Sequence, residues 1–414
     1  MRKPGNGVAK GGRQLDRLKK IARWSALIIG GTITAAFALL LLGAHVYSMP
    51  YLSPWGSLLL NWFSPWFVVL PLFAAALIWI AGPRSRRGLR KALSLFAMAV
   101  AGIGAIAVGR MAAVARDNGV PIDLVRTLAS HPPLRQAPDH DIVYSHFDGE
   151  PLGLVLYKPD RQEQPSTAPI LVYIHGGGWV TGDRFGGGEN LRWFARRGWL
   201  AISIDYPLSS RERHLWNATT EQVGCALAWV QANAHRFGGD PTRISLIGDS
   251  AGGNLALNAG YRANTGRLRS SCGGNVPRVA AISAIYPAVH LADAYRNEFP
   301  QLGDMARGYA DAYVGGPPER FPDRYVSIDP ASYIAPEAPP TLLIVGENDH
   351  LLPAHLTYRF AAEAKRGGVN VQLVRFPYGQ HLFDQSTNTI GNQLVLGASR
   401  RFLEANGQTP RHRD

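Results

Sequence analysis

The feature that most constrains this chain is an N-terminal run of 60 residues, 24–83, that contains no Lys, Arg, Asp or Glu. A second run without these residues covers 92–109, and five basic side chains in the 84–91 segment separate the two runs. Uncharged stretches of this length are typical of helices that span a bilayer, which need about 20 predominantly apolar residues each.

We expect three membrane-spanning helices in these runs, at about 24–45, 58–80 and 92–109. The turn-like segment 48–54, which contains two prolines, divides the longer run into the first two spans. The third run is the shortest and is rich in Ala and Gly, so a buried or interfacial helix is its alternative.

The positive charge of the chain lies beside these spans. Residues 1–23 carry a net charge of +7 and residues 84–91 add five cations, so nearly all of the net +13 is accounted for and the remainder of the chain is close to neutral. This distribution argues against nucleic acid as a partner. Since cytoplasmic loops are enriched in Lys and Arg, we expect an integral protein of a bacterial inner membrane, with the C-terminal domain on the periplasmic or extracellular side.

The C-terminal two thirds of the chain is typical of an α/β domain. Helical patterns separate the strands from the third strand onward, and several strands are continuous apolar runs, as in a parallel sheet covered on both faces. The first two strands, joined by Asp148-Gly149-Glu150, predict an antiparallel hairpin. The eight predicted strands are 142–147, 152–157, 170–175, 200–205, 244–248, 279–286, 341–345 and 371–376.

The strongest chemical signal is Gly248-Asp249-Ser250-Ala251-Gly252-Gly253, between a predicted strand and a predicted helix. It fits the G-x-S-x-G pattern, in which a sharp strand-to-helix turn exposes a nucleophilic hydroxyl. A second signal, His175-Gly176-Gly177-Gly178-Trp179, comes directly after the apolar strand residues 170–174. Consecutive glycines expose backbone N–H groups, so we expect donors of this loop, together with the N–H of Ala251, to stabilise an oxyanion.

A serine nucleophile needs a histidine base and an acid that orients the histidine. In this kind of fold the order along the chain is serine, acid, histidine. His381, after the last strand, is the predicted base, and His350 is the alternative. Asp349, in the loop after the strand at 341–345, is the predicted acid, and Glu347 is the alternative.

Together these motifs resemble the hormone-sensitive-lipase-like and carboxylesterase branches of the α/β-hydrolase esterases. The resemblance covers about residues 140–406 and implies an α/β-hydrolase fold, the oxyanion role of Gly177, Gly178 and Ala251, and a structural role for His175. It departs from many members at His350, where they have proline, and in the N-terminal spans, which are outside the family's core. We divide the chain into a basic cytoplasmic N-terminus (1–23), a membrane region (24–110), a linker or cap element (111–140), a catalytic domain (141–406) and a disordered tail (407–414).

The sequence thus predicts a membrane-anchored serine carboxylesterase or lipase-like hydrolase acting on a small-molecule or lipid ester, without a metal or organic cofactor. Alternatives are O-deacetylation of an envelope polysaccharide or acyl transfer with the same triad, or a hydrolase-like domain that only binds a ligand. Residues 288–335 interrupt the strand-helix alternation and are expected to border the site. One disulfide between Cys225 and Cys272 is conceivable, but the apolar helical pattern around Cys225 favours a buried free thiol.

Overall fold

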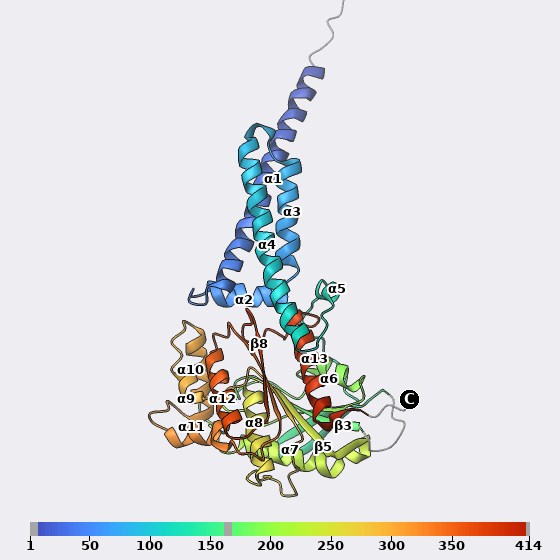
Figure 1. Ribbon diagram of the computed structural model, residues 1–414, viewed down its shortest axis with the longest axis vertical. Coiled ribbons are helices and arrows are strands. Elements are labelled where there is room, and N and C mark those ends of the chain that lie inside the picture. The colour runs from blue at the N-terminus through green and yellow to red at the C-terminus, as the bar shows by residue number, and fades with distance from the viewer. Residues whose placement is uncertain (1–6, 161–167, 411–414) are drawn as a thin grey trace, which may run out of the picture.

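The computed structural model describes residues 7–160 and 168–410, with side chains from residue 13 onward. The first six residues of the predicted basic N-terminus and residues 411–414 of the predicted tail lie outside the described residues. A bundle of long helices stands at one end of the molecule and an α/β domain at the other (Figure 1).

The bundle is formed by four helices: α1 (Gly7–His45), α2 (Leu52–Trp62), α3 (Trp66–Ala81) and α4 (Arg87–Asp117). By length and composition, the segments Arg13–His45 and Arg84–Asp117 can each cross a membrane. Helices α2 and α3 pass the same test only as a pair, and they are bent by 93° relative to each other.

The predicted second span, 58–80, is divided between two helices, because residues 58–62 belong to α2 and residues 66–80 to α3. Pro65 has no backbone N–H and disfavours a helical conformation at Ser64, so the chain turns between the two helices. Helix α2 then lies across the end of the bundle, next to the α/β domain, while α3 runs beside α1 and α4 (Figure 1).

The eight predicted strands are all present and form one sheet with the order β1-β2-β4-β3-β5-β6-β7-β8. Strand β2 pairs antiparallel with β1 and with β4, and the remaining neighbours are parallel. The strands are β1 (His140–Phe147), β2 (Glu150–Tyr157), β3 (Ala168–Ile174), β4 (Leu200–Ile204), β5 (Gly239–Asp249), β6 (Ile282–Ile285), β7 (Thr341–Gly346) and β8 (Val371–Phe376).

Helices cover both faces of this sheet and enclose two apolar cores. One core continues into the bundle, because Met111 and Ala115 of α4 are fully buried against it. The helices of the domain are α5 (Leu124–Thr127), α6 (Gly188–Ala195), α7 (Thr219–Asn233), α8 (Ala251–Asn264), α9 (Leu291–Tyr295), α10 (Leu302–Val314), α11 (Pro322–Ile328), α12 (Ala354–Arg366) and α13 (Ile390–Leu403).

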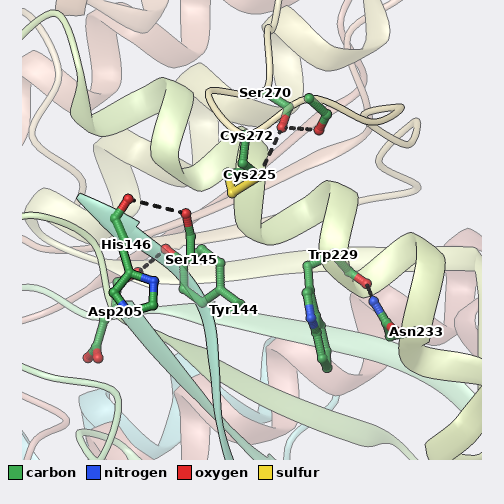
Figure 2. Close-up of a disulfide and its surroundings, with 10 residues drawn as sticks. Tyr144, Ser145, His146, Asp205, Cys225, Trp229, Asn233, Ser270 and Cys272 are labelled. Atoms are coloured by element: carbon green, nitrogen blue, oxygen red, sulfur yellow. Dashed lines mark hydrogen bonds between the residues drawn. A yellow bond between two sulfur atoms is a disulfide. The ribbon is translucent and has the colours of Figure 1, made fainter. Parts of the chain in front are cut away.

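The two cysteines form a disulfide, so the predicted free thiol at Cys225 is wrong. Figure 2 shows Cys272, on the loop that follows α8, beside Cys225 of α7. The loop returns across α7, where Ser271 donates its backbone N–H to the Glu221 carbonyl at 3.2 Å. The pairing depends on this tertiary contact, which the helical pattern around Cys225 does not encode.

Candidate active site

Ser250 occupies the turn between β5 and α8. Its backbone has φ 54° and ψ −118°, an unfavourable conformation for a residue with a side chain. The flanking glycines allow this turn, because a Cβ on Gly248 would lie 2.4 Å from the Gly252 carbonyl oxygen. A Cβ on Gly252 would lie 2.0 Å from the carbonyl oxygen of Ile174. The local sequence therefore places the hydroxyl at the carboxyl edge of the sheet.

The imidazole of His381 lies between the serine and a carboxylate. Its Nε2 is 3.0 Å from Ser250 Oγ, and its Nδ1 is 2.7 Å from Asp349 Oδ2. Because an ionised carboxylate can only accept, Nδ1 carries the proton and Nε2 is left to accept from the hydroxyl. The structure thus brings together all three residues that the sequence singled out.

Asp349 is held in place on its other side. Its Oδ1 accepts the backbone N–H groups of Leu351 at 3.0 Å and Leu352 at 2.8 Å, and the residue is fully buried. With both oxygens engaged, the carboxylate fixes the orientation of the His381 ring.

The two alternative residues point elsewhere. The His350 ring bonds to the Tyr47 carbonyl oxygen through Nε2 and to the Gln380 side chain through Nδ1, at 3.0 and 2.9 Å. Burial lowers the pKa of His350, which favours the neutral ring. Glu347 forms an ion pair with Arg375 at 2.7 Å. The side chains of His350 and Glu347 therefore bond to residues other than those of the triad.

The glycine loop after β3 has the conformation that glycine permits. Gly177 and Gly178 have φ values of +106° and +60°. Within the described residues, no backbone carbonyl outside the regular helices and strands accepts their N–H groups. The ring of Tyr309 in α10 covers Gly178, so the 288–335 segment borders this loop as expected.

His175, the first residue of the motif, packs against Tyr206 and helps to hold the glycine loop in place. Its ring stacks on Tyr206 at a centroid distance of 4.2 Å, and the Tyr206 hydroxyl donates to the His175 carbonyl oxygen at 2.9 Å. Burial lowers the pKa of His175, so the neutral form is favoured.

Two buried carboxyl groups behind the site were not predicted. Asp249 accepts the hydroxyl of Tyr173, and Asp384 accepts the hydroxyl of Tyr286, each at 2.6 Å. Both line one cavity of about 40 Å³. Burial raises the pKa of Asp249 and raises that of Asp384 from 3.8 to about 7. Asp249 stood inside the serine motif, but the sequence around Asp384 carries no signal for this pair.

Comparisons with known proteins find similar sequences and similar structures among esterases. The BD-FAE family model matches residues 154–363, just over half of the chain. The probable carboxylic ester hydrolase LipM of Mycobacterium tuberculosis is 31% identical over 254 residues, which are 60% of this chain and 57% of LipM. Esterase LipQ of the same organism is 29% identical over 268 residues, 64% of this chain and 61% of LipQ.

Among solved structures, the propionate-bound esterase Est2 of Thermogutta terrifontis has a TM-score of 0.54 and 25% identity. The match covers 68% of this chain and 100% of Est2. The chain spans only 57% and 61% of the length of the curated relatives LipM and LipQ. The eight-stranded, mostly parallel sheet fits the α/β-hydrolase fold.

Proposed function

Since this chain belongs to the BD-FAE family, we propose that it is a serine hydrolase that cleaves carboxylic esters. Ser250 is the nucleophile, His381 the base and Asp349 the orienting acid. The observation that carries this proposal is the continuous hydrogen-bonded series from Ser250 Oγ through both ring nitrogens of His381 to Asp349. The esterases among the similar proteins support the same reaction.

The reaction follows an acyl-enzyme route. His381 Nε2 takes the hydroxyl proton as Ser250 Oγ attacks the ester carbonyl, and the proton then passes to the departing alcohol. Water next attacks the acyl-enzyme with His381 again as the base, which releases the acid and restores Ser250. The buried Asp349 stabilises the imidazolium that forms in each half of the reaction.

The oxyanion of each tetrahedral intermediate is assigned to the N–H groups of Gly177, Gly178 and Ala251. Ala251 is the first residue of α8, where the helix dipole favours negative charge. Loss of one such donor typically lowers kcat by about 100-fold to 1,000-fold.

Labelling with a fluorophosphonate tests the nucleophile. Wild-type protein should be labelled, and Ser250→Ala should not, because the phosphonate bonds to the activated hydroxyl. Ser245→Ala is the matched control: Ser245 is a fully buried serine on the same strand and should leave labelling unchanged. Folded wild-type protein that resists the reagent would favour the alternative of a binding domain without catalysis.

We also propose that the helical bundle spans the bacterial inner membrane, with the hydrolase domain on the outer side. The basic 84–91 turn lies at the end of the bundle opposite the hydrolase domain (Figure 1). The Cys225–Cys272 disulfide supports the same side, since disulfides persist mainly outside the cytoplasm.

A reporter enzyme that is active only outside the cytoplasm, fused after Asp414, tests this orientation. Activity of the reporter is expected. Activity confined to a cytoplasm-specific reporter at the same position would reverse the proposed orientation.

The substrate proposal is an ester of a small molecule or lipid. Turnover of a lipid ester in vesicles, compared with release of acetate from envelope polysaccharide, separates the lipase-like reaction from O-deacetylation. Transfer of the acyl group to an added alcohol would identify acyl transfer.

A further inference from the structure

The end of the helical bundle contacts both loops that carry the triad partners of Ser250. We call this contact the junction. On the bundle side it consists of Ala44, Tyr47, Ser57, Asn61 and Trp62, and on the hydrolase side of Asn348, Asp349, His350, Gln380 and Leu382.

At the acid loop, the junction holds the residue next to the triad carboxylate. The side-chain amide of Asn348 donates to the Ala44 carbonyl oxygen at 2.7 Å and to Ser57 Oγ at 2.8 Å. Ala44 is in the last turn of α1, whose carbonyl groups have no partner within the helix. The Tyr47 hydroxyl also donates to the Asp349 carbonyl oxygen at 3.2 Å.

At the histidine loop, Asn61 of α2 contacts the residue next to His381, as Ala44 and Ser57 contact the residue next to Asp349. Its Oδ1 accepts the backbone N–H of Gln380 at 3.0 Å. The next helix residue, Trp62, donates its indole N–H to the Leu382 carbonyl oxygen at 3.1 Å. The two bonds lie on either side of His381 in the sequence, so α2 contacts the backbone both before and after the base.

Gln380 joins the two loops to each other. Its Oε1 accepts the backbone N–H of His350 at 2.9 Å and that of His381 at 2.8 Å. The His350 ring in turn stacks on Tyr47 with centroids 4.1 Å apart. Asn61 is 1% exposed, Gln380 4% and His350 0%, so water cannot readily replace these bonds.

The bundle contributes these contacts in addition to the hydrolase fold. Est2 corresponds over its whole length to 68% of this chain, so a third of the chain has no counterpart there. In this protein, part of the support of the acid and histidine loops comes from helices that precede these two loops by 304 and 319 positions in the sequence.

We propose that the junction sets the catalytic geometry and that Asn61 is a positioning residue, which acts through Gln380 on His381 and on the acid loop. The proposal rests on the proposed function of the triad. Loss of the Asn61 oxygen leaves the Gln380 N–H buried without an acceptor, and the histidine loop then relaxes away from Ser250. Misplacement by about 1 Å costs on the order of 100-fold in rate.

The test compares full-length variants in nanodiscs, with a soluble chromogenic butyrate ester as substrate. Asn61→Leu keeps the side-chain size but removes the acceptor, and kcat should fall about 10-fold to 100-fold while KM is nearly unchanged. The separate variant Asn61→Asp keeps an acceptor oxygen at the same position. Its kcat should therefore be much closer to that of the wild type than to that of Asn61→Leu. A merely structural role would change stability without this rescue, so the thermal midpoint of each variant is measured in parallel.

Ser130→Ala is the matched control. It removes a 3.0 Å bond to the Trp62 carbonyl oxygen, on the same helix. This bond leads to the linker, whose residues 129–131 contact Ser386, Thr387 and Asn388 and not the residues next to His381 or Asp349. It should leave kcat unchanged. If Asn61→Leu does not fold, Ser57→Ala tests the acid-loop side, because it removes one acceptor of Asn348 with a minimal change in volume.

The outcomes distinguish the two proposals. Wild-type protein labelled at Ser250, with equal kcat for Asn61→Leu or Ser57→Ala and for Ser130→Ala, would overturn the junction alone. Turnover that persists in Ser250→Ala would overturn the proposed function itself.

Discussion

The helical bundle and the hydrolase domain differ in where their apolar side chains lie: the bundle exposes many of them, and the domain buries them. In the domain, Ile170, Val172 and Leu246 of the central strands are fully buried. In the bundle, Ile28 is 61% exposed, Phe73 55% and Ile80 79%. Water would penalise such an outer surface, whereas hydrocarbon would not. The comparison supports the proposal that the bundle is built for hydrocarbon and the domain for water.

The two regions also differ in how their elements pack against each other. Helices of the bundle approach each other at glycines: a Cβ on Gly56 would lie 2.3 Å from the Leu40 carbonyl oxygen, and one on Gly104 would lie 2.4 Å from that of Phe67. Such close approach is typical of helices that associate in lipid, where burial of large side chains brings no gain. The core on one face of the domain's sheet is filled mainly by large aliphatic and aromatic side chains.

The largest effect on stability is expected from removal of the disulfide, which should sharpen the comparison by weakening one region only. The bond joins residues 47 positions apart, and closing a loop of this length stabilises a fold by about 2–4 kcal/mol. The double variant Cys225→Ala, Cys272→Ala should lower the thermal midpoint of the domain. Circular dichroism during heating should show that helices of the bundle outlast the domain; simultaneous loss of both would mean that the core shared through Met111 and Ala115 couples their unfolding.

A pair of arginine substitutions tests the difference in solvent directly. Phe73→Arg, near the middle of α3, should disfavour membrane insertion by about 2.5–3.5 kcal/mol. Val326→Arg, at a similarly exposed site of α11 (60%), should change stability by less than about 0.5 kcal/mol. The fraction of protein recovered in membranes and its thermal midpoint are the measurements. Equal tolerance of both arginines would break the comparison.

The smallest effect concerns the buried carboxyl group of Asp384 and its dependence on pH. Its pKa is raised from 3.8 to about 7, because burial disfavours the charged form. The folded state therefore binds the proton more tightly, and its stability falls as the pH rises through this window. Asp384→Asn, which cannot ionise, should flatten the decline in thermal midpoint between about pH 4 and pH 7. An unchanged decline would assign the pH dependence to another group.

Local patterns were sufficient to predict the sheet and the residues that meet at Ser250. Each strand carries its own apolar periodicity, and the order of Ser250, Asp349 and His381 follows from how strands of this fold end at one edge. The break within the predicted 58–80 span was missed because a proline turn decides it, and the prediction of a free Cys225 failed because a returning loop brings Cys272 to it. Asn61, Gln380 and Asp384 gain their roles only through partners that are distant in the sequence, and an isolated polar residue gives no signal of such a partner.

Helix α4 runs without interruption from the basic 84–91 end of the bundle to Asp117, where its last turns belong to the core of the hydrolase domain. A flexible tether would let an anchored enzyme sample a range of heights and tilts. A continuous helix is a rigid connection. Under the proposed topology, Ser250 therefore stays at one fixed distance from the bilayer surface. Substrates are then sorted by where their ester group resides along the membrane normal, before any contact with the binding pocket.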